Sequence, residues 1–240
     1  MKTTLGILAA IVLVILLIWM LQEYRENGMG SSYAAPAEAP APAQAAGSSF
    51  TYNFDTDTVG AAPAKFHGAR TGQGTEGKWM VMADSTAPSR PNVVAQTSTD
   101  STDYRFPLLI ADDGSFKDLE ISVRFKAVSG KVDQAGGLVF RLKDANNYYI
   151  VRANALEDNY RLYHVVNGSR RQFAGANFKV TSGEWHELRV EAMGNKFICY
   201  YDGAKKIEAT DDTFKEGGKI GLWTKADSVT YFDDLKVVAK

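Results

Sequence analysis

The sequence predicts an all-β protein in which two antiparallel sheets pack face to face as a jelly-roll sandwich. Short runs of β-branched and aromatic residues recur along most of the 240-residue chain, and turns rich in Gly, Asn and Asp separate them. Several runs alternate apolar and polar side chains, as half-buried strands do. After residue 50, no stretch carries the 3.6-residue apolar period of a helix. Strands at this spacing are typical of two-layer sandwiches.

The first element precedes the strands and is apolar throughout. The run "LGILAAIVLVILLIWML", Leu5–Leu21, contains no charged side chain. As a helix with about 1.5 Å rise per residue it spans roughly 26 Å, close to the roughly 30 Å of a bilayer core. We therefore expect residues 1–24 to form a single transmembrane anchor. A cleaved signal peptide is the alternative, but the run is longer than the usual apolar region and no small-x-small site follows it directly.

The charges that flank this run predict its orientation. Lys2 lies before it, whereas "QEYRENG" after it carries one Arg against two Glu. The positive-inside rule then places the N-terminus in the cytoplasm. We expect a single-pass protein of a bacterial inner membrane with its bulk on the periplasmic side. Residues 25–49, which include "GSSYAAPAEAPAPAQAAGSS", predict an extended Ala/Pro-rich linker, and residues 50–240 predict one domain.

The sequence of this domain predicts about a dozen strands separated by turns. Asn167-Gly168 is the strongest hairpin signal, because Asn-Gly suits a tight turn between two strands. The segment "DLEISVRFKAVSG" alternates cleanly between apolar and polar residues. The other strand-bearing segments are "GGLVFRLKDANNYYIVRAN", "DNYRLYHVVNGSRRQFAGA", "EWHELRVEAMGNKFICYYDGAKKIEATD" and "GGKIGLWTKADSVTYFDDLKVVAK".

These segments carry motifs that resemble the concanavalin A-like jelly rolls. They include Gly-Leu-Val-Phe, Trp-His-x-Leu-x-Val, Gly-x-Gly-Leu-Trp and a final Phe-Asp-Asp-Leu-x-Val. Within that superfamily the chain is most similar to the laminin-G-like and 3-keto-disaccharide-hydrolase-like bacterial domains. The resemblance covers roughly residues 50–240 and is strongest from Gly136 onward. It implies the fold, but the superfamily includes glycosidases, lectins, carbohydrate-binding modules and adhesion domains, so it does not imply one activity.

The sequence lacks the known signatures of catalysis in this superfamily. Hydrolases of the laminarinase type carry Glu-x-Asp-x-x-Glu on one strand, and here Glu187 and Glu191 lack the central Asp. The three histidines, His67, His164 and His186, do not show metal-ligand spacing. We therefore expect a binding role rather than an enzyme. Hydrolysis of a (3-keto-)disaccharide, as a glycoside hydrolase, is an alternative.

Aromatic and hydrogen-bonding side chains on neighbouring strands predict a carbohydrate site. Sugar sites combine a flat apolar surface with a few polar groups. The candidate ligand-binding residues are Tyr148, Arg152, Tyr160, His164 and Arg141. Because successive side chains of a strand point to opposite faces, only about half of such residues line one groove. A sheet that simply carries amphipathic Tyr and Arg is the alternative.

The composition limits the classes of partner that we expect. The formal net charge of -1 gives no global reason for binding nucleic acid. We expect the membrane and a glycan as partners. A second possibility is an accessory subunit of a larger membrane complex, in which small residues near the start of the apolar run permit close helix contact. The single cysteine, Cys199, lies in a strand-like run and predicts an inert packed thiol.

One acidic residue in the last strand predicts a structural tie. By strict alternation, Asp233 shares a face with Leu235 and Val237 and lies in the core row, where an unpaired carboxylate is costly. Jelly rolls of the laminarinase type often bind a structural calcium ion through an Asp of the final strand. The resemblance thus implies calcium ligands at Asp233 and Asp55, and hydrogen bonds from backbone N–H groups are the alternative. In either case we expect Asp233 to tie the last strand to the first segment of the domain.

Overall fold

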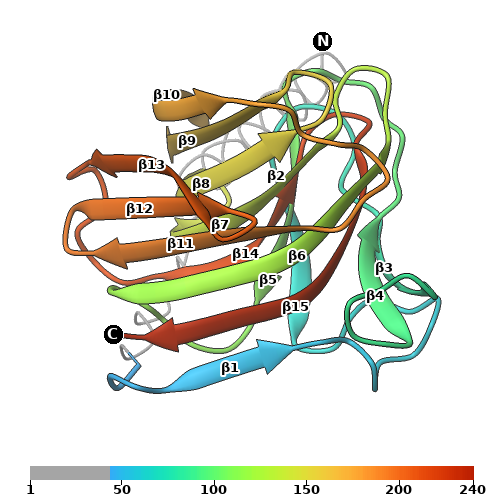
Figure 1. Cartoon of the computed structure of the whole chain (residues 1–240), viewed down its shortest axis with the longest axis horizontal. Helices are drawn as coiled ribbons and strands as arrows, with labels where there is room; N and C mark the ends of the chain where they lie inside the picture. Colours follow the sequence, from blue (N-terminus) through green and yellow to red (C-terminus); the bar gives the residue numbers. More distant parts are fainter. Residues whose placement is uncertain (1–43) are drawn as a thin grey trace, which may run out of the picture. The chain divides into compact units, whose positions relative to one another are not determined.

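The computed structural model describes residues 44–240 as two antiparallel sheets packed face to face (Figure 1). The predicted anchor and most of the predicted linker lie outside the described residues. Gln44 and Gly47, near the end of the predicted linker, already donate backbone hydrogen bonds to Ser115 and Ala239 of the domain. The all-β prediction is confirmed, because residues 44–240 contain no α-helix.

Within residues 44–240, no helix is long and apolar enough to cross a membrane.

The first sheet lies nearer the viewer in Figure 1 and contains eight strands. Its order is β13-β12-β11-β6-β15-β4-β3, and β1 pairs with β15 beside β4. The strand bounds are β1 Ser49–Tyr52, β3 Trp79–Ala83, β4 Asn92–Gln96, β6 Leu119–Ser129, β11 His186–Met193, β12 Lys196–Tyr201, β13 Ala204–Thr210 and β15 Val229–Ala239.

The second sheet lies behind the first and contains seven strands in the order β10-β9-β8-β7-β14-β5-β2. The strand bounds are β2 Phe66–Gly72, β5 Arg105–Ala111, β7 Ala135–Asp144, β8 Asn147–Asn154, β9 Asn159–Val166, β10 Ser169–Asn177 and β14 Lys219–Thr224. Neighbouring strands in both sheets often lie far apart in the sequence, as in β6 and β15. This crossed connectivity is the jelly-roll arrangement that the sequence predicts.

The main core lies between the sheets and is made by the inward rows of both. On β6, the alternation of the sequence is confirmed, because Ile121, Val123 and Phe125 are fully buried while the residues between them are half-exposed. Phe140 of β7 stacks on Tyr149 of β8, with ring centroids 5.4 Å apart. Offset aromatic pairs of this kind add to the stability that buried apolar area supplies.

A second apolar cluster fills the outer face of the second sheet, which points away from the first sheet. Here Phe106 of β5 stacks on Trp223 of β14 at 5.3 Å. The sheet curls enough for distant strands to meet, since the Thr71 hydroxyl of β2 hydrogen-bonds the Tyr148 hydroxyl of β8 at 2.8 Å. This curling buries an outer face that the sequence predicts to be available for ligands.

The last strand departs from simple alternation because it contains a β-bulge. The register against β6 shifts between Asp233 and Lys236, and Asp234 adopts a left-handed φ of 50°. A bulge inserts an extra residue and changes which side chains share a face. Phe232 therefore faces the core before the bulge, and Leu235 does so after it. The prediction that Asp233 shares a core row with Leu235 is wrong for this reason.

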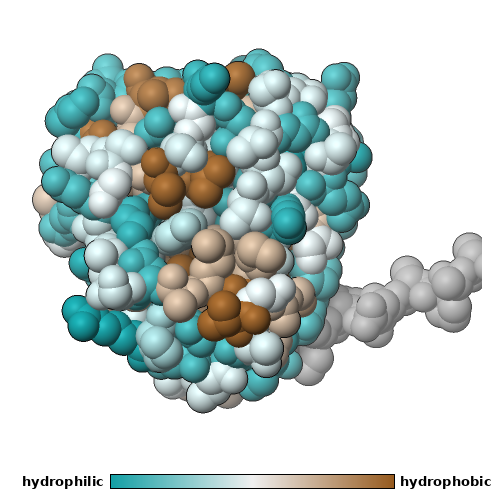
Figure 2. Space-filling view, turned by 90° about the vertical axis from the view of Figure 1, so that its right-hand side faces the viewer, coloured by the Kyte–Doolittle hydropathy of each residue, from teal (hydrophilic) through white to brown (hydrophobic). Residues whose placement is uncertain are grey.

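The surface is mixed in character. Seen from the side of β3 and β4, hydrophilic side chains surround several separate apolar patches (Figure 2). Single exposed apolar side chains are normal on a folded protein and need no partner. Within the described residues the exposed large apolar side chains are Val59, Tyr104, Val128, Val132, Leu156 and Met193.

Candidate functional site

The five predicted ligand residues lie in three different environments. Tyr148 and Arg152 project onto the outer face of the second sheet. Tyr160 lies in the core between the sheets. His164 and Arg141 lie near a pocket at one end of the sandwich, which Arg141 lines directly. The structure therefore does not bring the five residues together in one site.

The two tyrosines are enclosed by protein. The Tyr148 side chain is fully buried, and its burial raises the pKa of the hydroxyl to about 12. Tyr160 is also fully buried and donates to the carbonyl of Tyr200 at 3.2 Å. Burial raises the pKa of Tyr160 well above its ordinary value, because a phenolate loses its hydration there. Both side chains serve packing in this arrangement.

Arg152 is held by partners of its own. Its guanidinium donates to Glu157 at 2.8 Å and to the Tyr163 hydroxyl at 3.0 Å, and it also hydrogen-bonds Asn159. Only 4% of Arg152 is exposed. Its donors are therefore largely satisfied within the outer face.

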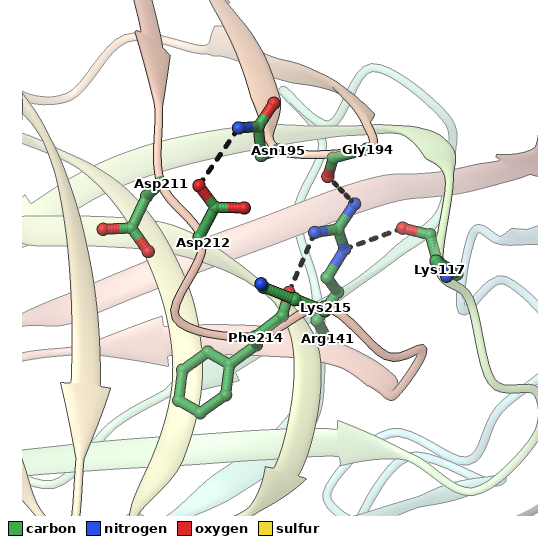
Figure 3. A pocket seen from close by; sticks show the side chains of 8 residues that line it. All are labelled: Lys117, Arg141, Gly194, Asn195, Asp211, Asp212, Phe214 and Lys215. Carbon is green, nitrogen blue, oxygen red and sulfur yellow. Dashed lines mark hydrogen bonds between the residues drawn. The ribbon is translucent and has the colours of Figure 1, made fainter.

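A pocket at the end of the sandwich combines charged groups of both signs (Figure 3). Its volume is about 230 Å³. Loops that lie far apart in the sequence form this pocket. We call it the Arg141 pocket after the residue at its base. The lining residues are Lys117, Arg141, Gly194, Asn195, Asp211, Asp212, Phe214 and Lys215.

Arg141 fixes the base of this pocket. Its guanidinium donates to three backbone carbonyls, those of Lys117 at 2.7 Å, Phe214 at 3.0 Å and Gly194 at 2.7 Å (Figure 3). Asp118 lies 3.4 Å away and balances part of the charge. Burial lowers the pKa of Arg141, yet a guanidinium stays protonated because its ordinary pKa is so high. The three loops therefore meet at one rigid, charged side chain.

The rim of the Arg141 pocket alternates donors and acceptors. Lys117 and Lys215 are exposed and each offers an ammonium group. Asp212 is exposed and accepts from the Asn195 side-chain amide at 3.2 Å. An amide also offers both a donor and an acceptor to a ligand. The pocket is thus equipped for a neutral ligand that has many hydroxyl groups.

An acid–base pair lies beside the pocket. The Asp211 carboxylate contacts the His164 ring nitrogen Nδ1 at 3.1 Å and accepts from the Tyr149 hydroxyl at 2.7 Å. Burial alone raises the pKa of Asp211, but hydrogen bonds from Thr213, Tyr149 and His164 outweigh burial and hold this pKa below its ordinary value. Asp211 points away from Arg141 in Figure 3 and links the pocket to His164.

Comparison with known proteins decides the family. Residues 54–238 match the model of the 3-keto-alpha-glucoside-1,2-lyase-like domain. The chain belongs to this family. The resemblance to concanavalin A-like jelly rolls, and to the 3-keto-disaccharide-hydrolase-like domains among them, is confirmed.

This lyase-like domain also resembles other characterised proteins over part of its length. The levanase of Bacillus subtilis (strain 168) is 31% identical over 111 residues, which are 46% of this chain and 16% of the levanase. This chain thus matches a small part of that protein.

Solved structures share the fold of the lyase-like domain at low identity. The carbohydrate-binding module CBM66 from Bacillus subtilis has a TM-score of 0.56 at 23% identity, covering 67% of this chain and 91% of the module. A Bacillus subtilis protein of unknown function with a galectin-like fold has a TM-score of 0.54 at 11% identity, covering 82% and 99%. These likenesses show the two-sheet fold alone.

The predicted calcium ligands of this lyase-like domain are surrounded by hydrogen-bond donors. Both oxygens of Asp233 accept from Ser89, and the N–H of Asp234 also donates to Asp233. Asp55 accepts from the Asn92 N–H at 3.1 Å. These hydrogen bonds use part of the accepting capacity of both carboxylates, and calcium binding at this place stays a prediction. Among residues 44–240, no group of three or more His, Cys, Asp or Glu side chains could hold a metal ion.

Asp233 and Asp55 also have different partners from those that we expect. Asp233 contacts Ser89 of the β3–β4 loop, and Asp55 contacts Asn92, the first residue of β4. Asn92 in turn donates to the carbonyls of Asp55 and Asp57. The Asp233 side chain thus ties the last strand to this loop. The prediction that Asp233 itself ties the last strand to the first segment is wrong, because its partner is Ser89 and the backbone pairing of β1 with β15 makes that tie.

The sequence patterns that predict strands do not reveal the Arg141 pocket. Asp211, Asp212 and Lys215 come from the β13–β14 connection, and Asn195 comes from the β11–β12 turn. Alternation applies to strands and says nothing of which loops converge. The signal that was available is the density of polar residues in "TDDTFKEGG" and "GNK", which marks turns that bear side chains with hydrogen-bonding capacity.

Proposed function

We propose that this chain is a non-catalytic carbohydrate-binding module and that it binds a neutral sugar in the Arg141 pocket. One observation carries the proposal. Three loops are fixed on the Arg141 guanidinium, and their rim presents ammonium, carboxylate and amide groups side by side. Each sugar hydroxyl both donates and accepts, so it needs such a mixture. Held in place before binding, these groups lose little entropy when the ligand arrives.

The family and the fold support this proposal independently of the pocket. The family's description refers to a glucoside, and the solved structure with a TM-score of 0.56 is a carbohydrate-binding module. A fold of this kind hosts many functions, so the site must carry the argument. The donors and acceptors on the rim of the Arg141 pocket are the observation that supports sugar binding.

We also propose that the module is displayed on the periplasmic side of a bacterial inner membrane. Leu5–Leu21 is apolar enough to serve as an anchor, and residues 25–49 are suited to act as a tether. A module held in this way binds glycans close to the membrane surface. The alternative role, an accessory subunit of a membrane complex, predicts instead a stoichiometric complex without glycan binding.

A screen of the full-length chain on a glycan array tests binding. The protein should be kept in a detergent without a sugar headgroup, since alkyl glycosides would compete for the site. We expect a small set of related neutral oligosaccharides to bind, and the Asp212→Ala variant to lose these signals. Binding that is equal in wild type and Asp212→Ala would place the sugar elsewhere, and an empty array would contradict the proposal.

A lyase is the second candidate function, and one observation favours it. The family's description names a lyase-like domain, and the His164–Asp211 pair provides one acid–base couple beside the pocket. Incubation with a 3-keto-disaccharide, followed by mass spectrometry, separates the two roles. Cleavage that is lost in His164→Gln supports the lyase. Recovery of intact sugar supports the binding module.

A further inference from the structure

A second polar site lies on the outer face of the second sheet, where Arg170 of β10 and Tyr104 contact each other. The Arg170 backbone N–H donates to the Tyr104 hydroxyl at 3.2 Å. The centre of the Arg170 guanidinium lies 4.5 Å from the Phe106 ring, 4.6 Å from the Tyr163 ring and 5.5 Å from the Trp223 ring. Three aromatic faces therefore hold this cation in one place, as cation–π contacts do.

The Arg170 guanidinium differs from those of the three buried arginines, Arg105, Arg141 and Arg152. Arg105, Arg141 and Arg152 each donate three or more hydrogen bonds to carbonyls or polar side chains. Among residues 44–240, the Arg170 guanidinium has neither a hydrogen bond nor an ion pair, and its buried Nη1 has no partner. A guanidinium carries five N–H donors in a planar fork. The aromatic contacts fix the orientation of the Arg170 guanidinium, but none of its N–H groups has a hydrogen-bond partner among residues 44–240.

The acidic groups near this site are already paired with other cations. Asp133 is fully buried and lies 2.9 Å from the Lys225 ammonium. Asp103 lies 2.6 Å from the same ammonium, and Glu157 pairs with Arg152. None of these carboxylates forms an ion pair with Arg170, although Asp133 acts on its charge from a longer distance. An unpaired, partly desolvated cation favours an anionic ligand.

Tyr104 supplies a surface for a ring. It is 43% exposed, and its ring packs edge-on against Phe106 at 4.8 Å. Its hydroxyl donates to the carbonyl of Gly168 at 2.9 Å, which fixes the orientation of the ring. A fixed, exposed aromatic ring is an apolar platform with a polar edge. The Tyr104 ring and the Arg170 guanidinium both pack against the Phe106 ring.

We propose that Tyr104 and Arg170 form a second binding site, for an acidic saccharide that carries a carboxylate or a sulfate group. The Nε and Nη2 groups of Arg170, which unlike Nη1 are not buried, bind the anionic group through two parallel N–H···O hydrogen bonds, as guanidinium groups do with carboxylates. The sugar ring lies against Tyr104. This site does not share a residue with the Arg141 pocket, so it goes beyond the neutral-sugar binding proposed above.

Calorimetry on the full-length chain, in a detergent that lacks sugar and charge, tests this proposal with three ligands. The first is trigalacturonate, the second is its methyl ester, which has the same rings without the charge, and the third is a sulfated galactose trisaccharide. We expect at least one anionic ligand to bind about tenfold or more tightly than the ester. Preference for trigalacturonate identifies the group as a carboxylate, and preference for the third ligand identifies it as a sulfate. Equal binding of all three, or binding of none, would overturn the proposal.

Two variants locate the site. Arg170→Gln should abolish the preference for the anionic ligand. Arg171→Gln removes the same charge from the neighbouring exposed residue and should change the affinity by less than about twofold. If both variants lose the ligand equally, the binding is a general charge effect and the proposal fails. Should Arg170→Gln not fold, Tyr104→Ala replaces it, and we expect it to weaken binding of the anionic ligand because the ring contact is lost; unchanged affinity in Tyr104→Ala would then overturn the proposal. The Asp212→Ala variant should keep this binding, so failure at the Arg141 pocket is distinguishable from failure here.

Discussion

Ser89 donates to Asp233 through both its backbone N–H and its hydroxyl, at 2.9 Å each, across 144 residues of sequence. The Asp233 side chain is fully buried. Its burial raises the pKa of the carboxyl to about 6, although the hydrogen bonds from Ser89 and from the Asp234 N–H act in the opposite direction. This contact joins the bulge of the last strand to the β3–β4 loop. It also makes the stability of the fold depend on pH.

The first prediction concerns that pH dependence. The pKa of Asp233 is higher in the folded state than in the unfolded state, so its stabilising contribution is present below the unfolded pKa and is lost as pH rises through about 6. The variant Asp233→Asn removes this titration. We expect the free energy of unfolding of wild type, relative to the variant, to increase by roughly 2 kcal/mol between pH 7.5 and pH 4.5. Urea unfolding at both pH values measures this difference, and a constant difference would contradict it.

The second prediction concerns calcium. The two carboxylates that the sequence predicts as calcium ligands, Asp233 and Asp55, accept hydrogen bonds from protein groups. The donors are the backbone N–H groups of Ser89, Asp234 and Asn92. We expect a chelator to leave the melting temperature of the wild type unchanged, because hydrogen bonds already hold these groups together. Thermal unfolding with EDTA, and again after calcium is restored, checks this. A melting temperature that falls with EDTA and recovers with calcium would show that the ion is structural.

The third prediction concerns Arg105, which is fully buried at the start of β5. Its guanidinium donates to the carbonyls of Thr75, Glu76 and Ala226, and so joins two loops to the sheet. Arg105→Met removes the donor from all three carbonyls, of which that of Ala226 is buried. We expect a loss of about 3 to 5 kcal/mol in the free energy of unfolding. The exposed Arg171→Met is the matched control and should change this quantity by less than about 0.5 kcal/mol.

The fourth prediction concerns the thiol. Cys199 is fully buried on β12, and burial raises the pKa of its thiol far above the ordinary value. Since the thiolate is the reactive form, we expect a thiol reagent to react with the unfolded chain but not with the native one. Absorbance of a disulfide reagent with and without denaturant provides the measurement. Fast reaction under native conditions would mean that β12 opens readily.

Local sequence patterns determine much of this fold because strands and tight turns have local causes. Asn167-Gly168 forms the β9–β10 turn, and both residues adopt the left-handed φ values, 49° and 78°, that such turns require. The apolar row of β6 is buried as its alternation predicts. These features depend on neighbours in sequence, so a single sequence is sufficient to reveal them.

The rest depends on contacts that no local pattern records. The bulge at Asp234 reverses the alternation of β15, and the curling of the second sheet buries Tyr148 where alternation alone suggests a surface. Tyr160 and Arg152 likewise carry polar groups that protein atoms satisfy. The Arg141 pocket forms because three loops meet on one guanidinium. Only the tertiary structure brings such groups together.

The most direct test of the account is calorimetric titration of one oligosaccharide, taken from the glycan array, into three forms of the full-length chain. Asp212→Ala removes an acceptor from the rim of the Arg141 pocket, whereas Glu216→Ala removes an exposed carboxylate from the same loop but not from the pocket. The account predicts that Asp212→Ala weakens binding about tenfold, that Glu216→Ala matches wild type, and that the sugar is recovered intact. Equal affinity in wild type and Asp212→Ala, or a cleaved sugar, would contradict it.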